Sequence, residues 1–335
     1  MTDAGSGPPA AHPDSLLVRP DGSTVWLKVH RCVWSGRHAP NSLDSVRECH
    51  RAGVARAEVD LWLLRDTDGI IDHDDLLHRP GRGNLRAREM SRRDVLRAPP
   101  DAQPALLSEF VDVVRRESYP TRIEIDIKDE LPWPPQRVDE ILGLLAPIRE
   151  RVTLAGCNDE TLRRLAAADG QLSIGFNPAF HLDWVPLHRR HELAGTAGPD
   201  GWLNRTGQQS LSARLSVLRK LVPAADELHL RLEAFEHLTI DAATDTVGQL
   251  HAHGWAVDVW TLDTGMTRWR ARMNAAVAAG VDMITTTTAP NLARAFRDGA
   301  PRRSDAPALA AGEKVTGLAP GTARRRRRDA DGITR

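Results

Sequence analysis

Short runs of alternating apolar and polar residues recur along the middle of the chain and predict β-strands. The run at 121–128 is the most regular, because its three isoleucines lie on one face and Glu124, Asp126 and Lys128 lie on the other. Similar runs predict strands at 24–30, 56–64, 151–156, 172–177, 227–232, 255–261 and 282–287. A further run at 69–74 follows a turn and predicts a hairpin-like extension of the strand at 56–64.

Helical patterns fill the intervals between these strands. We expect helices at 42–53, 105–118, 135–150, 158–169, 210–222, 243–254, 268–280 and 291–299. Ser42 and Asn158 are suited to cap two of these helices, and Gly254 is suited to end another. An irregular, arginine-rich segment precedes the helix at 105–118, and a long loop covers about 178–204.

Eight strand signals alternate with helix signals, which favours a parallel α/β architecture. Eight βα units fit a (β/α)8 TIM barrel. A doubly wound open sheet is the alternative, but no glycine-rich phosphate loop follows the strand at 24–30. We therefore predict three regions, which are a disordered N-terminal segment at 1–22, the barrel at 23–298 and a disordered arginine-rich tail at 299–335.

Composition limits the classes of function. The chain of 335 residues carries 45 Lys and Arg against 45 Asp and Glu, so its formal net charge is zero and gives no sign of nucleic-acid binding. Three cysteines do not suggest a disulfide framework. No apolar run reaches the roughly 20 residues that span a bilayer. The N-terminal residues lack the basic start and apolar core of a signal peptide, so we expect a soluble, cytoplasmic protein.

Polar side chains gather where the predicted strands end. The carboxyl ends of the strands of such a barrel meet at one mouth, and barrel enzymes carry out their chemistry there. The side chains that we expect at this mouth are His30, Arg31, Glu58, Asp60, His73, Asp126, Lys128 and Trp260.

Three carboxylates at one point repel one another unless a cation lies between them. Oxygen ligands without a cysteine favour Mg²⁺ or Ca²⁺, so we predict one divalent cation. Arg31 and Lys128 beside such a metal suit a phosphate group, and His30 and His73 suit a general acid and a general base. These residue types together predict a phosphodiesterase whose partner is a small-molecule phosphodiester.

The residues at the mouth lie in motifs that resemble the glycerophosphodiester phosphodiesterase family. The motifs are HR at 30–31, EVD at 58–60, DHDDLLHRPGRG at 72–83, IDIK at 125–128, VWTLD at 259–263 and GVDMITTTTAP at 280–290. The resemblance covers roughly residues 25–298 and implies a barrel of the phospholipase-C-like phosphodiesterase type. By position, it implies metal ligation by Glu58, Asp60 and Asp126, a catalytic pair of His30 and His73, phosphate contacts from Arg31 and Lys128, and an alcohol pocket walled by Trp260.

The sequence departs from the family's usual motifs at four places. Cys32 stands where glycine usually follows the histidine and arginine, and Pro40 stands where the family's ENT helix start has its acid. Asp126 is one methylene shorter than the usual glutamate, and the last strand ends in threonines without an aspartate. An aspartate at this ligand position also resembles the sphingomyelinase-D-like phospholipases, which form a cyclic phosphate. A barrel that acts on another phosphoester, or only binds it, is a further alternative.

Several choices stay open at this point. The sequence does not name the alcohol, choose between Mg²⁺ and Ca²⁺ or fix the base, although we favour His73 as base and His30 as acid. The long loop carries His181, Trp184, His188 and Trp202, which could cover the site. We expect the arginine run at 324–328 to be solvated, with contact to anionic surfaces as the alternative.

Overall fold

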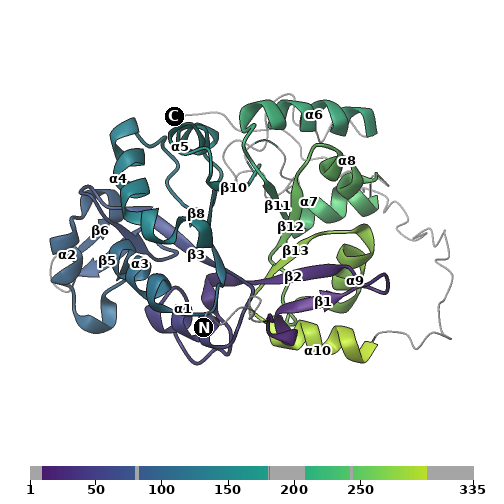
Figure 1. Ribbon diagram of the computed structural model, residues 1–335, viewed down its shortest axis with the longest axis horizontal. Helices are drawn as coiled ribbons and strands as arrows, with labels where there is room; N and C mark the ends of the chain where they lie inside the picture. Colours follow the sequence, from purple (N-terminus) through teal and green to yellow (C-terminus); the bar gives the residue numbers. More distant parts are fainter. Residues whose placement is uncertain (1–9, 80–82, 180, 182–207, 242–243, 300–335) are drawn as a thin grey trace, which may run out of the picture. The chain divides into compact units, whose positions relative to one another are not determined.

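Eight parallel strands close into a barrel in the computed structural model, which describes residues 10–79, 83–179, 181, 208–241 and 244–299. The barrel strands are β2 (Thr24–Val29), β3 (Arg56–Leu63), β8 (Arg122–Ile127), β9 (Val152–Gly156), β10 (Ser173–Phe176), β11 (Glu227–Arg231), β12 (Ala256–Trp260) and β13 (Met283–Thr286). Figure 1 shows them with helices on their outer side. The predicted (β/α)8 barrel is confirmed, and the open sheet is excluded, because β2 pairs in parallel with both β3 and β13.

The helices follow the barrel strands and cover their outer faces (Figure 1). They are α1 (Leu43–Arg51), α3 (Leu107–Arg116), α4 (Pro135–Leu145), α5 (Asp159–Ala168), α6 (Gln208–Leu221), α8 (Thr246–Ala252), α9 (Trp269–Ala279) and α10 (Ala289–Gly299). The caps predicted at Ser42 and Asn158 are confirmed, since each side chain accepts a hydrogen bond from the backbone N–H three residues later. Within the described ranges, no helix is long and apolar enough to cross a membrane.

The segment between β3 and β8 contains more structure than the sequence predicted. The predicted hairpin is confirmed as β4 (Gly69–Ile71), which pairs antiparallel with β3. The segment predicted to be irregular contains β5 (Leu76–Arg79), β6 (Gly83–Arg86), α2 (Arg92–Leu96) and 3-10 turns at Ala87–Glu89 and Pro100–Ala102. The first two residues of the helix predicted at 105–118 form β7 (Ala105–Leu106) instead. Its apolar side chains, among them Met90 and Val95, form a small core of their own. Their burial stabilises elements too short to be recognised from periodicity.

Two further short helical elements directly follow β11 and were not predicted. They are α7 (Leu232–Glu236) and a π-helical turn at His237–Asp241. A 3-10 stretch at Ala146–Arg151 ends the helix that was predicted to continue to residue 150. The 3-10 stretch lies at the end of a helix, where backbone geometry changes within one turn.

The prediction that residues 1–22 are disordered is wrong for the part that the structure describes. A 3-10 turn at Pro13–Ser15 leads into β1 (Leu16–Val18), which pairs antiparallel with β2. Leu17 packs into the barrel core with 1% of its surface exposed, so this contact outweighs the Gly- and Pro-rich composition nearby. Residues 1–9 lie outside the described residues, as do residues 300–335 of the tail predicted at 299–335, which include its arginine run.

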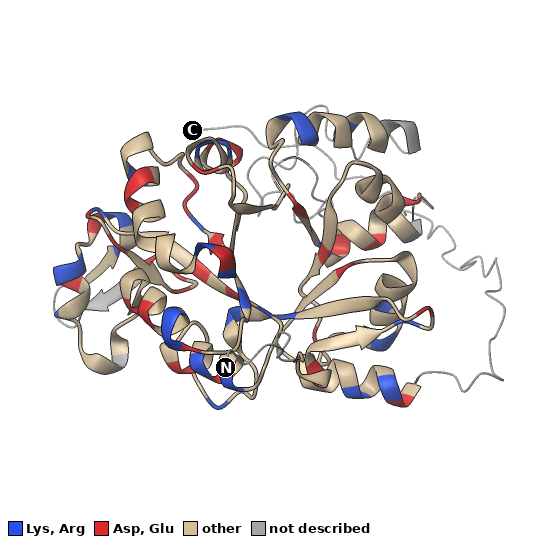
Figure 2. Ribbon diagram, in the orientation of Figure 1, with Lys and Arg blue, Asp and Glu red and all other residues tan. Residues whose placement is uncertain are grey.

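The apolar core lies between the strands and the helices. Ile123 and Ile125 of β8 belong to one buried cluster with Phe110 of α3 and Ile141 of α4. Alternation therefore turns the polar residues of β8 into the barrel, where branched apolar side chains are usual. Figure 2 shows acidic and basic positions along β3, β8, β11 and β12 inside the ring of helices. The lumen of this barrel is thus charged.

Candidate active site

The chain turns sharply where β2 ends, and this turn places the first two site residues. His30–Cys32 forms a 3-10 turn in which Arg31 and Cys32 have positive φ angles of 52° and 55°. The backbone N–H of Arg31 donates a hydrogen bond of 2.8 Å to Glu58 Oε2, which fixes the turn against the first half of β3. A left-handed conformation at Cys32 explains why glycine is usual at this position of the resembled family.

Three acids from β3 and β8 converge beside this turn. Asp60 and Asp126 are direct neighbours in the register of the two strands, and Glu58 lies two residues below Asp60. One carboxylate oxygen from each of the three lies within 4.8 Å of the others. Glu58 and Asp60 are buried, with 3% and 0% of their surface exposed, while Asp126 is half-buried. The acids that were predicted as metal ligands therefore form one cluster.

Asp60 is held by side chains from three other segments of the chain. The Asn41 amide donates a hydrogen bond of 2.7 Å to Asp60 Oδ2, and Asn41 Oδ1 accepts one of 3.2 Å from the Asp60 backbone N–H. Lys128 Nζ lies 2.7 Å from Asp60 Oδ1 and also contacts Asp126, and Arg31 Nε lies 3.3 Å from Asp60 Oδ2. Asn41 was not among the predicted site residues, although it directly precedes the predicted cap Ser42.

Burial shifts the pKa values of the titratable groups in the cluster. Burial and the charge of Asp60 raise the pKa of Glu58 well above its usual range. Burial opposes ionisation of Asp60 too, but Lys128 and Asn41 hold its pKa below the usual range. Burial and the charge of Arg31 lower the pKa of His30 to about 4, although His30 Nε2 lies 3.8 Å from Glu58 Oε2. The acid that is hardest to ionise is therefore Glu58, which lies two residues below Asp60 on β3.

The cluster fits a divalent cation on the chemistry of its donors. Its three ligands offer only carboxylate oxygens, which Mg²⁺ and Ca²⁺ prefer. Asp60 Oδ1 is buried without a well-directed hydrogen bond, so it has capacity for a ligand bond. A cation beside Glu58 would also favour the charged form of that acid, which its present surroundings disfavour.

His73 reaches the mouth through the β3–β4 hairpin. The backbone N–H of Asp72 donates to the Asp60 carbonyl oxygen at 3.2 Å, and the Trp62 indole donates to the His73 carbonyl oxygen at 3.1 Å. These two bonds fold the end of the hairpin back over β3. The ring of His73 is exposed, and its Nδ1 lies 2.8 Å from Asp74 Oδ1.

One pocket of about 380 Å³ joins these groups at the carboxyl ends of the strands. It is lined by seven of the predicted site residues, which are His30, Arg31, Glu58, His73, Asp126, Lys128 and Trp260, while Asp60 lies behind its wall. Other lining residues come from the far side of the barrel, among them Asn177, Arg231 and Thr261. Of the loop residues that could cover the site, Trp184, His188 and Trp202 lie outside the described residues.

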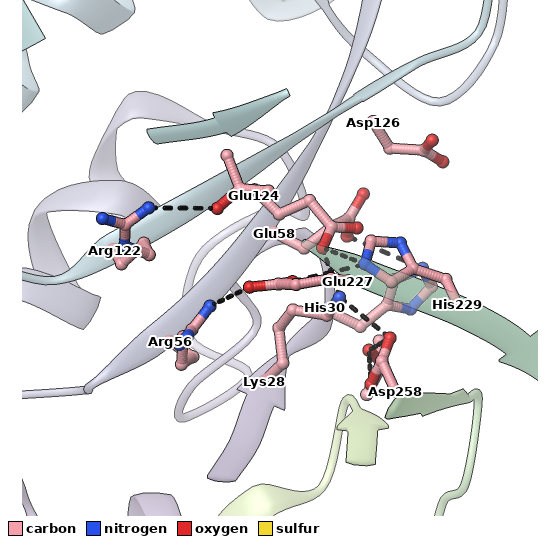
Figure 3. Close-up of polar contacts among 12 residues, drawn as sticks. Lys28, His30, Arg56, Glu58, Arg122, Glu124, Asp126, Glu227, His229 and Asp258 are labelled. Atoms are coloured by element: carbon pink, nitrogen blue, oxygen red, sulfur yellow. Dashed lines mark hydrogen bonds and ion pairs between the residues drawn. The ribbon is translucent and has the colours of Figure 1, made fainter. Parts of the chain in front are cut away.

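At the floor of this pocket, a network of buried charges fills the lumen, and the sequence did not predict it (Figure 3). Lys28 of β2 is 1% exposed and contacts Glu124, and its Nζ lies 2.8 Å from Asp258 Oδ2. The Thr285 hydroxyl donates to Asp258 at 2.8 Å. Each of these residues occupies a lumen-facing position of its strand. Polar residues at such positions are the feature of the sequence that could have indicated the network. Lys28 thus places a positive charge against two buried acids.

The same network continues to the opposite side of the lumen. His229 Nε2 lies 3.4 Å from Glu124 Oε2 and 3.3 Å from Glu227 Oε2, and Arg56 Nη1 lies 2.6 Å from Glu227 Oε1. Burial opposes protonation of His229, but the charge of Glu124 raises its pKa above the usual range. A Cβ on Gly175 would lie 2.5 Å from the His229 ring, so only glycine leaves room for this histidine. Two acids and a histidine can ligate a metal, but Lys28 and Arg56 already supply positive charge here.

The threonine-rich end of the last strand is ordered by an aspartate from the neighbouring strand end. Asp263, which follows β12, accepts hydrogen bonds from the Thr286 hydroxyl at 2.8 Å and from the Thr287 backbone N–H at 2.6 Å. The Thr288 hydroxyl accepts one of 3.0 Å from the Thr264 backbone N–H. A carboxylate from the neighbouring strand end therefore orders the threonine-rich end of β13.

Comparisons with known proteins agree with this geometry. The glycerophosphoryl diester phosphodiesterase family model matches residues 30–288. A glycerophosphodiester phosphodiesterase structure from Parabacteroides distasonis is similar, with 14% identity, a TM-score of 0.59 and coverage of 81% of this chain and 96% of that one. The enzyme from Thermotoga maritima has 16% identity, a TM-score of 0.55 and coverage of 81% and 98%.

A phosphodiesterase from Oleispira antarctica, solved with the product sn-glycerol-3-phosphate, has 16% identity, a TM-score of 0.55 and coverage of 81% and 96%. A comparison with curated proteins gives no significant match. At these identities the structural likeness establishes the barrel fold. The family match runs from His30 to Thr288 and includes every predicted site residue. The chain therefore belongs to the glycerophosphoryl diester phosphodiesterase family and is a phosphoric diester hydrolase.

Proposed function

We propose that the protein hydrolyses a glycerophosphodiester to sn-glycerol 3-phosphate and an alcohol, with one divalent cation, Mg²⁺ or Ca²⁺. The observation that carries this proposal is one pocket shared by two histidines, the basic side chains of Arg31 and Lys128, and an acidic cluster. The product complex of the Oleispira antarctica phosphodiesterase supports the same choice of product.

The acidic cluster and its neighbours would bind and orient the phosphate. Glu58, Asp60 and Asp126 would hold the cation, which when bound withdraws electron density from a phosphoryl oxygen. Arg31 presents a planar guanidinium to two phosphate oxygens, and its position is fixed by the hydrogen bond from its backbone to Glu58. Lys128, which now contacts two of the acids, adds a point charge beside them.

His30 and His73 would exchange the protons of the reaction. Water attacks phosphorus and loses a proton to one imidazole, while the bond from phosphorus to the alcohol oxygen breaks and the other imidazole protonates that oxygen. Both rings line the same pocket, and they come from separate segments, so they can lie on different sides of a bound phosphate. Trp260 would form a wall for the alcohol.

Cyclisation is the second candidate, and the shorter acid Asp126 is the observation that favours it. In that reaction a substrate hydroxyl replaces water as nucleophile, and the product is a cyclic phosphate. The alternative that the barrel only binds its ligand is weaker, because Asn41 still holds Asp60 and Asp263 still orders the last strand. Phosphorus NMR of the product distinguishes the two reactions.

Removal of divalent cations is expected to stop hydrolysis. After treatment with EDTA, release of sn-glycerol 3-phosphate should fall to the background rate, and Mg²⁺ or Ca²⁺ should restore it, because three carboxylates cannot bind a phosphate without a cation. Calorimetry should show that Glu58→Gln loses cation binding, whereas Asp112→Asn on the exposed face of α3 keeps it. Full activity in EDTA would contradict the metal-dependent mechanism.

Asn41→Ala is expected to weaken cation binding about 10- to 100-fold, which is the usual effect of losing a residue that orients a metal ligand. The variant leaves both the Asp60 N–H and Asp60 Oδ2 without their Asn41 partner. Asn41→Gly should behave in the same way, although it tolerates the positive φ of 60° at this position. Ser42→Ala, which removes only the cap of α1, is the matched control. Equal cation affinity in all four proteins, measured by calorimetry, would remove Asn41 from the site.

We also propose a cytoplasmic location. The structure describes Cys32, Cys49 and Cys157, and no disulfide joins any of them, which suits a reducing compartment. Measurement of free thiols in protein taken directly from cells would test this.

A further inference from the structure

The end of β8 is built by a side chain, and it lies directly beside Lys128. β8 ends at Ile127, but the Lys128 backbone N–H still donates to the Leu61 carbonyl oxygen of β3 at 2.9 Å. In a continued parallel ladder, the Leu63 N–H would donate to the Lys128 carbonyl oxygen. Asp129 Oδ2 accepts that hydrogen bond instead, at 3.1 Å. A carboxylate thus closes the ladder, and the backbone can leave the sheet directly after Lys128.

Asp129 also holds the loop that follows it. The same oxygen accepts a hydrogen bond of 3.1 Å from the Trp133 indole N–H. Trp133 is buried, with 3% of its surface exposed, and its backbone N–H donates to Thr161 Oγ1 of α5 at 3.1 Å. Burial raises the pKa of Asp129 to about 6, so this half-buried acid is still an anion at neutral pH. One carboxylate oxygen therefore joins the end of β3, the end of β8 and a buried aromatic residue.

The group that this arrangement fixes is the Lys128 ammonium. Lys128 lines the catalytic pocket, and its ammonium contacts both Asp60 and Asp126. Its backbone is tied to β3 on one side by its own N–H and on the other side by the Asp129 side chain. A displacement of a catalytic group by about 1 Å can cost about 100-fold in rate. The position of the Lys128 backbone therefore matters for any phosphate that the ammonium contacts.

We propose that Asp129 is a positioning residue, which holds the Lys128 ammonium where it meets the phosphate of the substrate. This inference rests on the proposed function, because it takes the phosphate contact of Lys128 from there. Asp129 acts through the two hydrogen bonds that its oxygen accepts and not through its charge. Asparagine offers the same acceptor at this position, whereas alanine offers none.

Replacement of the acceptor tests the proposal. Asp129→Ala is expected to lower kcat/KM for a glycerophosphodiester, and the affinity for inorganic phosphate in the presence of Mg²⁺, by about 10- to 100-fold. Asp129→Asn should stay close to wild type in both measurements, since it keeps both hydrogen bonds. If asparagine lost as much as alanine, Asp129 would act through its charge, and the proposal would be overturned.

A double-mutant cycle shows whether Asp129 acts through Lys128. In a Lys128→Met background no ammonium is left to position, so adding Asp129→Ala should change phosphate affinity by less than about twofold. A full loss from Asp129→Ala in that background would mean that the two residues act independently, which contradicts the proposal. The comparison of Asp129→Asn with Asp129→Ala needs no change at Lys128, so it decides the proposal even where Lys128→Met does not fold.

Thr161→Val is the matched control for loss of order in the loop. It removes the other hydrogen bond to Trp133 at nearly constant volume and leaves the contact with β3 in place. Urea unfolding should show a lower midpoint for Thr161→Val, as for Asp129→Ala, but calorimetry should show wild-type phosphate affinity. Equal loss of phosphate affinity in the two variants would assign the effect to the loop as a whole and refute the role of Asp129.

Phosphate binding also separates this proposal from the proposed function. If the wild-type enzyme released no sn-glycerol 3-phosphate from any diester but the cycle still showed coupling in phosphate affinity, the proposed function would fail and the role of Asp129 would stand. Wild-type hydrolysis and wild-type phosphate affinity in Asp129→Ala would refute that role and leave the proposed function intact.

Discussion

Alanine in place of either His30 or His73 is expected to lower kcat for the true diester substrate by about 10²- to 10⁴-fold, the usual contribution of a positioned acid or base. Both rings line the pocket of the acidic cluster, and each serves one of the two proton transfers that the reaction requires. Loss of one transfer cannot be made up by the other histidine, because attack and departure occur on opposite sides of phosphorus. Release of sn-glycerol 3-phosphate under saturating substrate measures the effect.

The control for these variants is His38→Ala. His38 is exposed on the same connection between β2 and α1 as His30, and it is not among the pocket-lining residues. This variant should keep the wild-type kcat. Unfolding midpoints and cation affinity should stay close to wild type for His73→Ala, since that ring is exposed and makes its ring contact with neighbouring Asp74. A variant of either predicted histidine that kept the wild-type kcat would rule out the acid–base pair.

The converging parts of the site could be predicted because strand alternation is a local property. On β3 and β8, the polar face is visible in the sequence, and Glu58, Asp60 and Asp126 fall on it. Closure of the eight strands then brings these faces to one mouth without further information. The hairpin that carries His73 was recognised for the same reason, since β4 is an apolar run directly after a turn.

The lumen network could not be predicted, because its partners are distant in sequence. Lys28 and Glu124 are 96 residues apart, and Arg56 and Glu227 are 171 residues apart. The alternation of β8 shows that Glu124 turns away from the isoleucines, but it does not show which charge it meets. Asn41 was missed for a related reason, because its role depends on a positive φ and on contact with a different strand.

The sequence did not predict strand β1, because the composition around its three apolar residues is typical of a disordered segment. Gly, Pro and Ala around it suggest disorder, and a run as short as Leu16–Val18 has no measurable period. Its stability comes from pairing with β2 and from burial of Leu17, and both are tertiary contacts. Contacts with the closed barrel therefore explain why β1 is a strand better than any local propensity does.

Lys28→Met is expected to reduce the free energy of unfolding by about 3–5 kcal/mol, the usual cost of removing one partner from a buried ion pair. Methionine fills a similar volume, so the loss would come mainly from charge. Glu124 and Asp258 would remain in the lumen without the ammonium that now contacts both. Urea denaturation followed by circular dichroism measures the change. We expect it to be among the most destabilising single substitutions on the barrel strands.

Two further proteins show whether charge or packing causes that loss. Lys220→Met changes an exposed lysine on α6 and should stay within about 0.5 kcal/mol of wild type. The triple variant Lys28→Met, Glu124→Gln, Asp258→Asn removes all three charges together and should recover much of the stability, because an uncharged set leaves no isolated buried ion. If the triple variant were no more stable than Lys28→Met alone, the lysine would act through packing. A loss below about 1 kcal/mol in Lys28→Met itself would mean that the two carboxylates gain protons or water at little cost.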